Sequence, residues 1–394
     1  MQTTTLGVIR KLGIVLAICS SVATSLAHAG PREQAKRIHD RLVGVPATSA
    51  VLDSMADKIA NGNAIGAAYE AMDNPVFYNT TIREFATPWS NREQSLFVDM
   101  NDFVATVIGM VRDDVPFDQV LYEDIVYVGT PNATGVPHSH TDNDHYLDLQ
   151  LNRVDLSDPA NLAQQRQSDL PNSPIAAGET AGVMTTRGFS QAFLVAGTNR
   201  AAIRFATLNF LCMDMEDFRD ITAHPDRIRQ DVSRSPGGDS GIFLNDCLSC
   251  HAGLDGLGGA FAHYDFDEDA QQLVYTADSV QPKFLNDAGA FRFGYATTDD
   301  SWINYWRTGP NEYVGWNGPG SGAGTGAKSL GMELAQTRQF ARCQVRKAFE
   351  KVCYRRPNGA ADEQAVETIA TSFESNNRSM KRVFAETALH CMGD

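Results

Sequence analysis

The sequence predicts a mainly α-helical protein, with a helical region at each end and a smaller domain between them. Apolar residues recur at helical spacing in residues 30–125 and again in residues 331–394. The segment between these regions is less regular and contains a short cysteine motif. The length of 394 residues also exceeds what one hydrophobic core usually holds. We therefore expect two or three structural units.

Residues 1–29 predict a secretory signal peptide. A cationic pair precedes an apolar run at 12–23, and Ala27-His28-Ala29 provides a cleavage site with small residues at both required positions. The run is well short of the roughly 20 residues that span a bilayer. A lipoprotein anchor on Cys19 is disfavoured because bulky Ile18 precedes it. We expect a periplasmic or secreted chain without a membrane span.

Residues 30–125 form the expected N-terminal helical domain. Its helices are predicted at 32–44, 50–62, 64–72 and 91–114, and prolines or glycines separate them.

Residues 126–182 are expected to be an irregular connecting segment with a strand or two, because they are rich in Asp, Asn, Pro and Ser. The segment contains a run of residues that could bind zinc or calcium. The spacing matches no standard metal motif, so a solvated loop is the favoured interpretation of these residues: His138, His140, Asp142, Asp144 and His145.

Residues 183–306 are expected to bind haem. A helix is predicted over 189–212, and the motif Cys247-Leu-Ser-Cys250-His251 follows it. Two thiols on one helical turn can add to the two vinyl groups of haem, and the adjacent histidine then becomes the proximal iron ligand. Zinc would need further ligands at suitable spacing, and a redox dithiol usually accompanies a βαβ pattern. The motif in an exported chain therefore predicts one covalent haem c in a cytochrome c-like domain.

The small residues that follow the motif, at 252–261, are expected where backbone passes close to the flat haem ring. Several residues of the sequence are candidates for the ligand at the sixth iron position. A methionine there would suit an electron carrier, whereas an open position would allow peroxide or oxygen chemistry. Met332 is the preferred distal candidate. Other candidates are Met184, Met213, Met215, His263 and His224.

Residues 307–330 are glycine-rich and are expected to be a flexible linker. They lead into the C-terminal helical domain at 331–394, where helices are predicted at 331–356, 361–374 and 378–391.

Seven cysteines also point to an oxidising compartment. Apart from Cys19 and the motif pair, four remain, which suggests two disulfides. Cys343 and Cys353 lie ten residues apart on one predicted helix, about 15 Å along its axis, too far to pair. In an up-down-up bundle the end of the third helix returns beside the end of the first. That arrangement favours Cys353–Cys391 and leaves Cys212 with Cys343. The alternative is four free buried thiols.

Four stretches resemble the planctomycete-type cytochrome c proteins, which are exported multi-domain chains. They begin at Arg37, Ala181, Cys247 and Leu330, and the haem segment is the most specific of them. In the family this segment runs Cys-x-x-Cys-His, then Asp, Leu and Gly, then an aromatic-Asp pair. The residues that match this pattern here are Asp255, Leu257, Gly258, Tyr264 and Asp265. Gly256 stands where the family has proline. The resemblance implies a role in electron transfer, although activities in the family are mostly unassigned.

The net charge of −15 disfavours nucleic acid and anionic lipid as partners. It would suit a redox protein with a basic docking face, but an acidic surface that serves only solubility is the favoured interpretation. The sequence thus predicts a monohaem cytochrome that relays single electrons. Two alternatives remain open: a haem enzyme such as a peroxidase or oxygenase, and a binding or scaffold protein with a structural haem.

Overall fold

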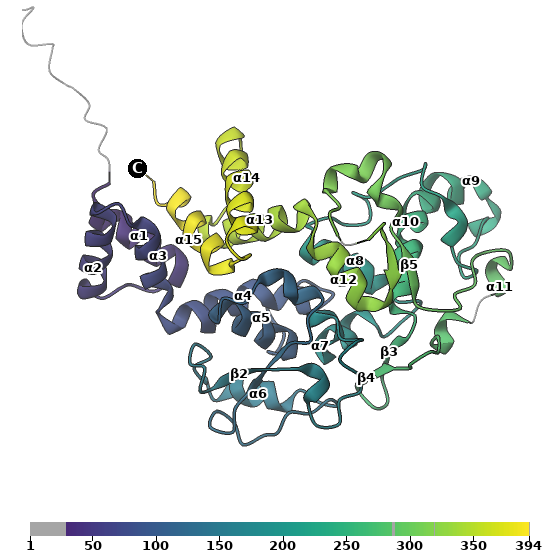
Figure 1. Ribbon diagram of the computed structural model, residues 1–394, viewed down its shortest axis with the longest axis horizontal. Helices are drawn as coiled ribbons and strands as arrows, with labels where there is room; N and C mark the ends of the chain where they lie inside the picture. The colour runs from purple at the N-terminus through teal and green to yellow at the C-terminus, as the bar shows by residue number, and fades with distance from the viewer. Residues whose placement is uncertain (1–28, 286–287, 319, 394) are drawn as a thin grey trace, which may run out of the picture.

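The computed structural model describes residues 29–285, 288–318 and 320–393. It confirms a mainly helical chain, and the described residues contain three small antiparallel sheets of two strands each (Figure 1). Apart from Ala29, the expected signal peptide lies outside the described residues. No helix in the described ranges is long and apolar enough to cross a membrane.

The first three helices form as the sequence predicts. They are α1 (Pro31–Val43), α2 (Ser49–Ala60) and α3 (Ala64–Met72). The side chain of Thr48 accepts a hydrogen bond from the N–H of Val51 and begins α2, and Asn63 begins α3 in the same way through Gly66.

The predicted helix at 91–114 is wrong in its first half. Helix α5 covers only Asp102–Arg112, after the short α4 (Arg83–Ala86). The side-chain amide of Asn91 donates to the carbonyl oxygens of Thr87 and Ser95, which holds residues 91–95 in a non-helical turn. Asn101 then caps α5 by accepting from the N–H of Val104. All of α5 is buried.

The segment 126–182 contains two strands and one helix. Strand β1 (Val126–Gly129) pairs with β2 (Leu162–Gln165), and α6 (Asp144–Leu151) lies between them in sequence. The sequence allowed for the strands but not for the helix.

The predicted helix at 189–212 is interrupted. Helix α7 (Arg187–Phe193) and α8 (Arg200–Phe210) are separated by a turn in which Asn199 adopts φ 56°. The motif region follows as α9 (Ser240–Ile242), a π-helical turn (Phe243–Cys247) and α10 (Leu248–Gly258). Beyond it lie the short α11 (Ala288–Phe291) and two antiparallel strand pairs. These are β3 (Tyr264–Asp267) with β4 (Gln272–Tyr275), and β5 (Ser301–Ile303) with β6 (Ala323–Thr325).

The glycine-rich segment has more fixed structure than a flexible linker. Its residues 323–325 form β6, and α12 (Gly326–Ala335) begins directly afterwards. The predicted helix at 331–356 is therefore wrong: α12 ends at Ala335, and α13 (Arg338–Cys353) is a separate helix. Thr337 causes the break, since its hydroxyl accepts from the N–H of Phe340 at 3.0 Å and caps α13.

Helices α13, α14 (Ala360–Ser375) and α15 (Met380–Cys391) pack together at the C-terminus. The cysteine pairs are those that the sequence favours: Cys353–Cys391 with Cα atoms 5.6 Å apart, and Cys212–Cys343 at 5.3 Å.

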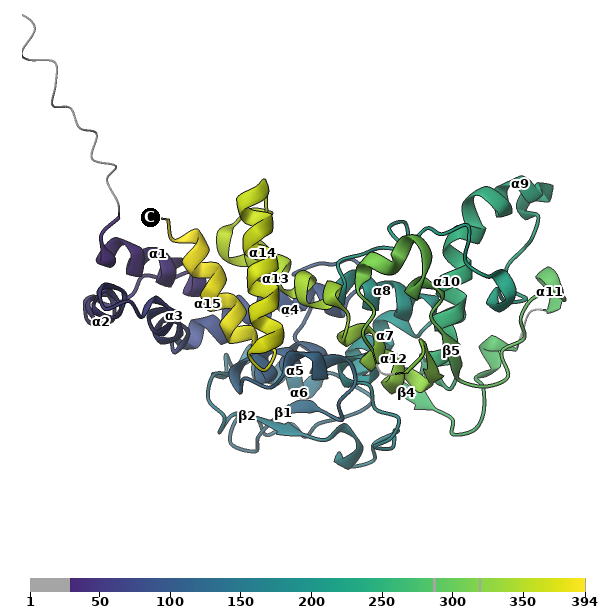
Figure 2. The same cartoon turned by 45° about the horizontal axis from the view of Figure 1, so that its top comes forward.

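The two ends of the chain lie side by side. Figures 1 and 2 show α15 against α1 and α3, with α9 and α10 at the far end of the molecule. The guanidinium of Arg37 on α1 donates to the carbonyl oxygen of Met392 at 2.7 Å. One continuous hydrophobic core includes Ile38 near the N-terminus, Trp306 near the motif and Phe384 near the C-terminus.

Candidate haem-attachment site

The motif cysteines lie at the junction of the π-helical turn and α10. Cys247 ends the turn and Cys250 follows three residues later, so both thiols project from one helical turn. Both are partly exposed and, within the described part of the chain, neither is in a disulfide. The other four cysteines of that part are paired. This thiol pair is available for covalent attachment of a cofactor.

A second segment, residues 213–222, runs alongside the motif. The thiol of Cys250 lies 3.5 Å from the carbonyl oxygen of Met215, and the N–H of Asp220 donates to the carbonyl oxygen of Ser249 at 2.9 Å. Large apolar side chains are exposed here and just before the motif. They are Ile221 (71% exposed), Ile242 (43%) and Leu244 (54%). Such apolar surface beside two thiols fits a flat hydrophobic cofactor that would cover it.

His251 is held by a carboxylate. Its Nδ1 lies 3.3 Å from Oδ1 of Asp255, four residues later on the same helix. An Nδ1–H that donates to this carboxylate leaves the Nε2 lone pair free to bind iron. The orientation of His251 therefore fits the proximal position.

Asp255 belongs to a buried charge cluster, the Asp255 cluster, which comprises His251, Asp255, Arg200, Asp231 and Arg229. Arg200 donates to both oxygens of Asp255, at 2.6 and 2.9 Å, and to both oxygens of Asp231, at 2.6 and 2.8 Å. Burial by itself would raise the pKa of Asp255, but the charge of Arg229 and the bonds from His251 and Arg200 bring that pKa below its usual range. Asp255 is thus a carboxylate.

Arg229 is almost fully buried within this cluster. Its guanidinium lies 4.9 Å from the ring centre of Phe284 and 3.9 Å from Oδ1 of Asp255. None of its side-chain nitrogens has a hydrogen-bond partner among the described residues. Burial lowers the pKa of Arg229 to about 10 despite the attraction of Asp255. Arg229 therefore acts on Asp255 mainly through its charge.

The glycines after the motif have a different role from the one predicted. A Cβ at Gly253 would lie 2.0 Å from Nε1 of Trp306, and one at Gly259 would lie 2.1 Å from the carbonyl oxygen of Ser301. Gly256 likewise approaches the carbonyl oxygen of Ile303. These glycines allow α10 to pack against β5 and Trp306, whereas the sequence interpretation assigned them to the haem ring.

The distal candidates are widely scattered. Met332 lies on α12, where its neighbour Gly331 packs against the carbonyl oxygen of Leu121, and Met184 is fully buried in the core near the same glycine. Met213 and Met215 instead belong to the segment beside the motif, and the backbone of Met215 contacts Cys250.

The two histidine candidates for the distal position differ in burial. His263 is buried 3.7 Å from Asp300, whereas His224 is exposed beside Asp226.

The histidine-rich segment is only in part the solvated loop that the sequence favoured: Asp142 and Asp144 are exposed, His138 and His140 are partly buried, and His145 is buried. His145 is buried at the start of α6, where its Nε2 accepts from the N–H of Gly129 at 2.9 Å and its Nδ1 contacts the carbonyl oxygen of Val136 at 2.7 Å. Both ring nitrogens are thereby used. Nδ1 of His138 and Nε2 of His140 are buried without a hydrogen-bond partner in the described structure.

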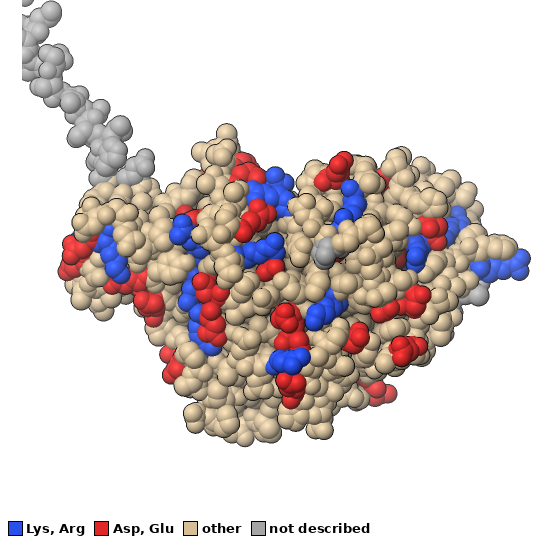
Figure 3. All heavy atoms as spheres, viewed as in Figure 1, with Lys and Arg blue, Asp and Glu red and all other residues tan. Residues whose placement is uncertain are grey.

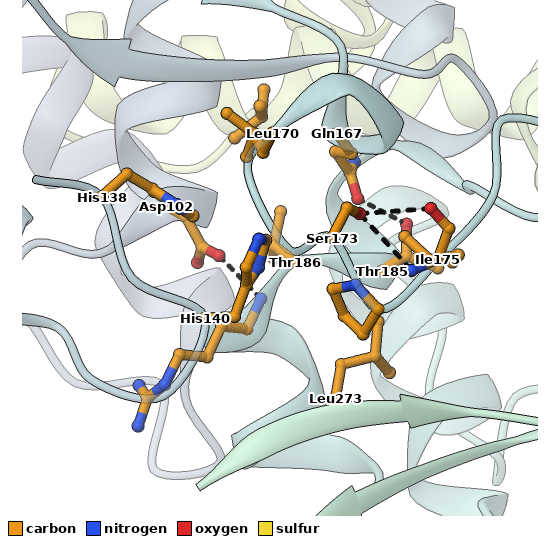
Figure 4. A pocket seen from close by; sticks show the side chains of 13 residues that line it. Asp102, His138, His140, Gln167, Leu170, Ser173, Ile175, Thr185, Thr186 and Leu273 are labelled. Carbon is orange, nitrogen blue, oxygen red and sulfur yellow. Dashed lines mark hydrogen bonds between the residues drawn. The ribbon is translucent and has the colours of Figure 1, made fainter.

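His138 and His140 line a small cavity that apolar side chains such as Leu170 and Ile175 also line (Figure 4). Its volume of about 30 Å³ has room for about two water molecules. Asp102 lies beside these two histidines in Figure 4 and is buried. Its carboxylate accepts a hydrogen bond from the N–H of Arg187 at 2.6 Å, and burial raises its pKa. Over the residues that the structure describes, no three or more His, Cys, Asp or Glu side chains are arranged to hold a metal ion.

Charged side chains of both signs are interspersed on the face shown in Figure 3. The negative net charge is therefore not gathered into one patch on that face.

Comparison of the chain with protein-family models, with curated proteins and with solved structures finds no match. The functional interpretation consequently depends on the geometry of the site.

The sequence interpretation missed the Asp255 cluster. The spacing of His251 and Asp255 was a usable signal, because side chains four residues apart meet on one face of a helix. Arg200 and Asp231 come from other elements, and no local pattern points to them.

Proposed function

We propose that the protein is an exported, periplasmic or secreted monohaem c-type cytochrome that relays single electrons between redox partners. The observation that carries the proposal is the pair of free thiols at Cys247 and Cys250 beside a histidine whose Nδ1 is already engaged by Asp255. The resemblance of the haem segment to planctomycete-type cytochrome c proteins supports it.

The residues of the motif would attach the haem and bind its iron, and the nearby apolar residues would cover the haem. Each motif thiol would add its S–H across one vinyl group of haem, which gives two thioether bonds, and His251 would donate its Nε2 lone pair to the iron. The haem supplies one-electron oxidation and reduction when bound. Ile242 and Leu244 would exclude water from its apolar surface. The acidic chain would dock a partner with a basic face through a weak interface.

A second candidate is a haem enzyme that uses peroxide or oxygen. One observation favours it: a carboxylate behind a metal-bound histidine raises the basicity of that ligand, and Asp255 has this position. The two candidates differ in whether the sixth iron position is filled.

Expression of the full chain in a host that matures c-type cytochromes tests the proposal. We expect covalent haem that survives denaturation in acid. A matched variant, Cys247→Ser with Cys250→Ser, should lose it, whereas Cys19→Ser should not. Reduced spectra with and without carbon monoxide then separate the candidates. A spectrum unchanged by carbon monoxide supports the carrier, and a shifted one supports the enzyme. Absence of covalent haem in the unmodified protein would overturn both.

The same preparation can identify the sixth ligand. Met215→Ala and Met332→Ala are a suitable pair, because Met215 lies in the segment that contacts Cys250 and Met332 lies on α12. Conversion of the low-spin spectrum to a high-spin one in either variant would identify that methionine.

A further inference from the structure

The hydrogen bond between His251 and Asp255 comes from local helix geometry. The two residues are four apart on α10, so their side chains lie on the same face. The side chain of Asp255 has no exposed surface, whereas that of His251 is 25% exposed. The carboxylate is thus on the inner side of the imidazole, and the ring projects from it toward the surface that carries the thiols.

Arg200 prevents Asp255 from turning away. Its guanidinium binds both carboxylate oxygens and is itself held by both oxygens of Asp231. The backbone N–H of Arg229 adds a further bond to Oδ2 of Asp255 at 3.2 Å. A carboxylate with this many fixed donors has one orientation, and that orientation places Oδ1 against His251.

The cluster is also balanced in charge. Asp255 and Asp231 carry two negative charges, and Arg200 and Arg229 carry two positive ones. Asp255 and Arg229 are buried, whereas the side chains of Arg200 and Asp231 are 23% and 18% exposed. Burial of charges is expensive unless each is paired, and the stability gained over an apolar core is often nil. Stability alone is therefore a weak reason for a carboxylate at this place, and its contact with His251 offers a functional one.

We propose that Asp255 is a positioning residue that fixes the His251 ring through Nδ1 and lowers the reduction potential of the iron that His251 would bind. This inference rests on the proposed haem attachment. A charged acceptor at Nδ1 makes the imidazole a stronger electron donor, and a negative charge close to the iron stabilises its oxidised form. Both effects favour the ferric state.

The test compares two variants of the haem-loaded full chain. Asp255→Asn removes the charge and weakens the acceptor at His251. Asp231→Asn is the matched control, because it removes one charge from the same cluster at a residue that binds Arg200 instead of His251. Potentials are measured by spectroelectrochemical titration.

We expect Asp255→Asn to raise the equilibrium constant for reduction at least tenfold, which is 59 mV for one electron. The control should change it by less than threefold. Equal shifts in the two variants would mean that only the charge of the cluster matters, and no shift would mean that Asp255 does not act on the iron. Either result overturns the inference.

A second measurement needs no variant and covers the case in which Asp255→Asn does not fold. In the reduced protein labelled with ¹⁵N-histidine, the Nδ1–H of His251 should exchange slowly with solvent because it donates to a buried carboxylate. Fast exchange would overturn the inference. An Asp255→Asn variant with normal haem content and an unchanged reduction potential would refute this inference alone. A wild-type protein without covalent haem would refute the proposed function together with it.

Discussion

The contact of Gly253 with Trp306 leads to a sharp prediction for the substitution Gly253→Ala. The added Cβ would lie 2.0 Å from Nε1 and 2.2 Å from Cε2 of the indole. Carbon atoms prefer separations of about 3.5–4.0 Å, so the ring or the helix must move by about 1.5 Å. Trp306 has little room to move, because it is fully buried and stacks on Phe218 with ring centres 4.2 Å apart.

The size of the effect follows from two opposing contributions. Overpacking of a core typically costs about 1–3 kcal/mol, and a contact with a rigid ring belongs at the upper end of that range. Replacing glycine by alanine in a helix stabilises it by about 1 kcal/mol. We therefore expect Gly253→Ala to lower the free energy of unfolding by about 2 kcal/mol.

Urea unfolding followed by tryptophan fluorescence measures this change. Gly289→Ala on α11 is the control, since no described atom beyond its chain neighbours lies within 4 Å of the added Cβ. We expect it to be neutral or to stabilise the protein by up to about 1 kcal/mol. If Gly253→Ala is as stable as Gly289→Ala, the close approach of α10 to Trp306 does not exist and the reasoning is refuted.

Two further predictions concern the disulfides and the histidines. Removal of the Cys212–Cys343 disulfide by substitution of both cysteines with alanine opens a loop of 131 residues and should cost about 5 kcal/mol in the chain-entropy model. Denaturant midpoints measure this loss, and an unchanged midpoint would contradict the pairing. Burial lowers the pKa of His138 to about 4, and the charges of His140 and His145 add to that effect. Between pH 6.5 and pH 4 the unfolded chain therefore binds more protons than the folded one, so stability should fall as the pH drops through this window. His138→Gln should flatten that fall in pH-dependent melting curves, and an unaltered slope would exclude His138 as its source.

Local sequence signals were sufficient for several elements. The three N-terminal helices, α14 and α15 follow from apolar periodicity. The cysteine pairing also follows, because Cys343 and Cys353 are both on α13 and too far apart to join.

Elsewhere, side chains that bond to nearby backbone overrode the periodicity. Asn91 holds a turn where a helix was predicted, and Thr337 ends one helix and begins another. Asn and Thr are weak helix formers, but the helix predictions followed the pattern of apolar positions around these residues. Only the hydrogen bonds that formed in the folded chain decided the outcome.

The sequence by itself determined the spacing of two thiols and a histidine in the Cys247–His251 motif, the four further cysteines that form two disulfides, and the helices at both ends. Tertiary structure alone decided how the ends share one core and what surrounds His251. Arg200 reaches Asp255 from another helix, and Asp231 holds Arg200 from a third part of the chain. The packing of α10 likewise places Gly253 against Trp306 and Gly256 against the carbonyl oxygen of Ile303. Periodicity reports neighbours along one element, whereas partners from different elements depend on how those elements pack.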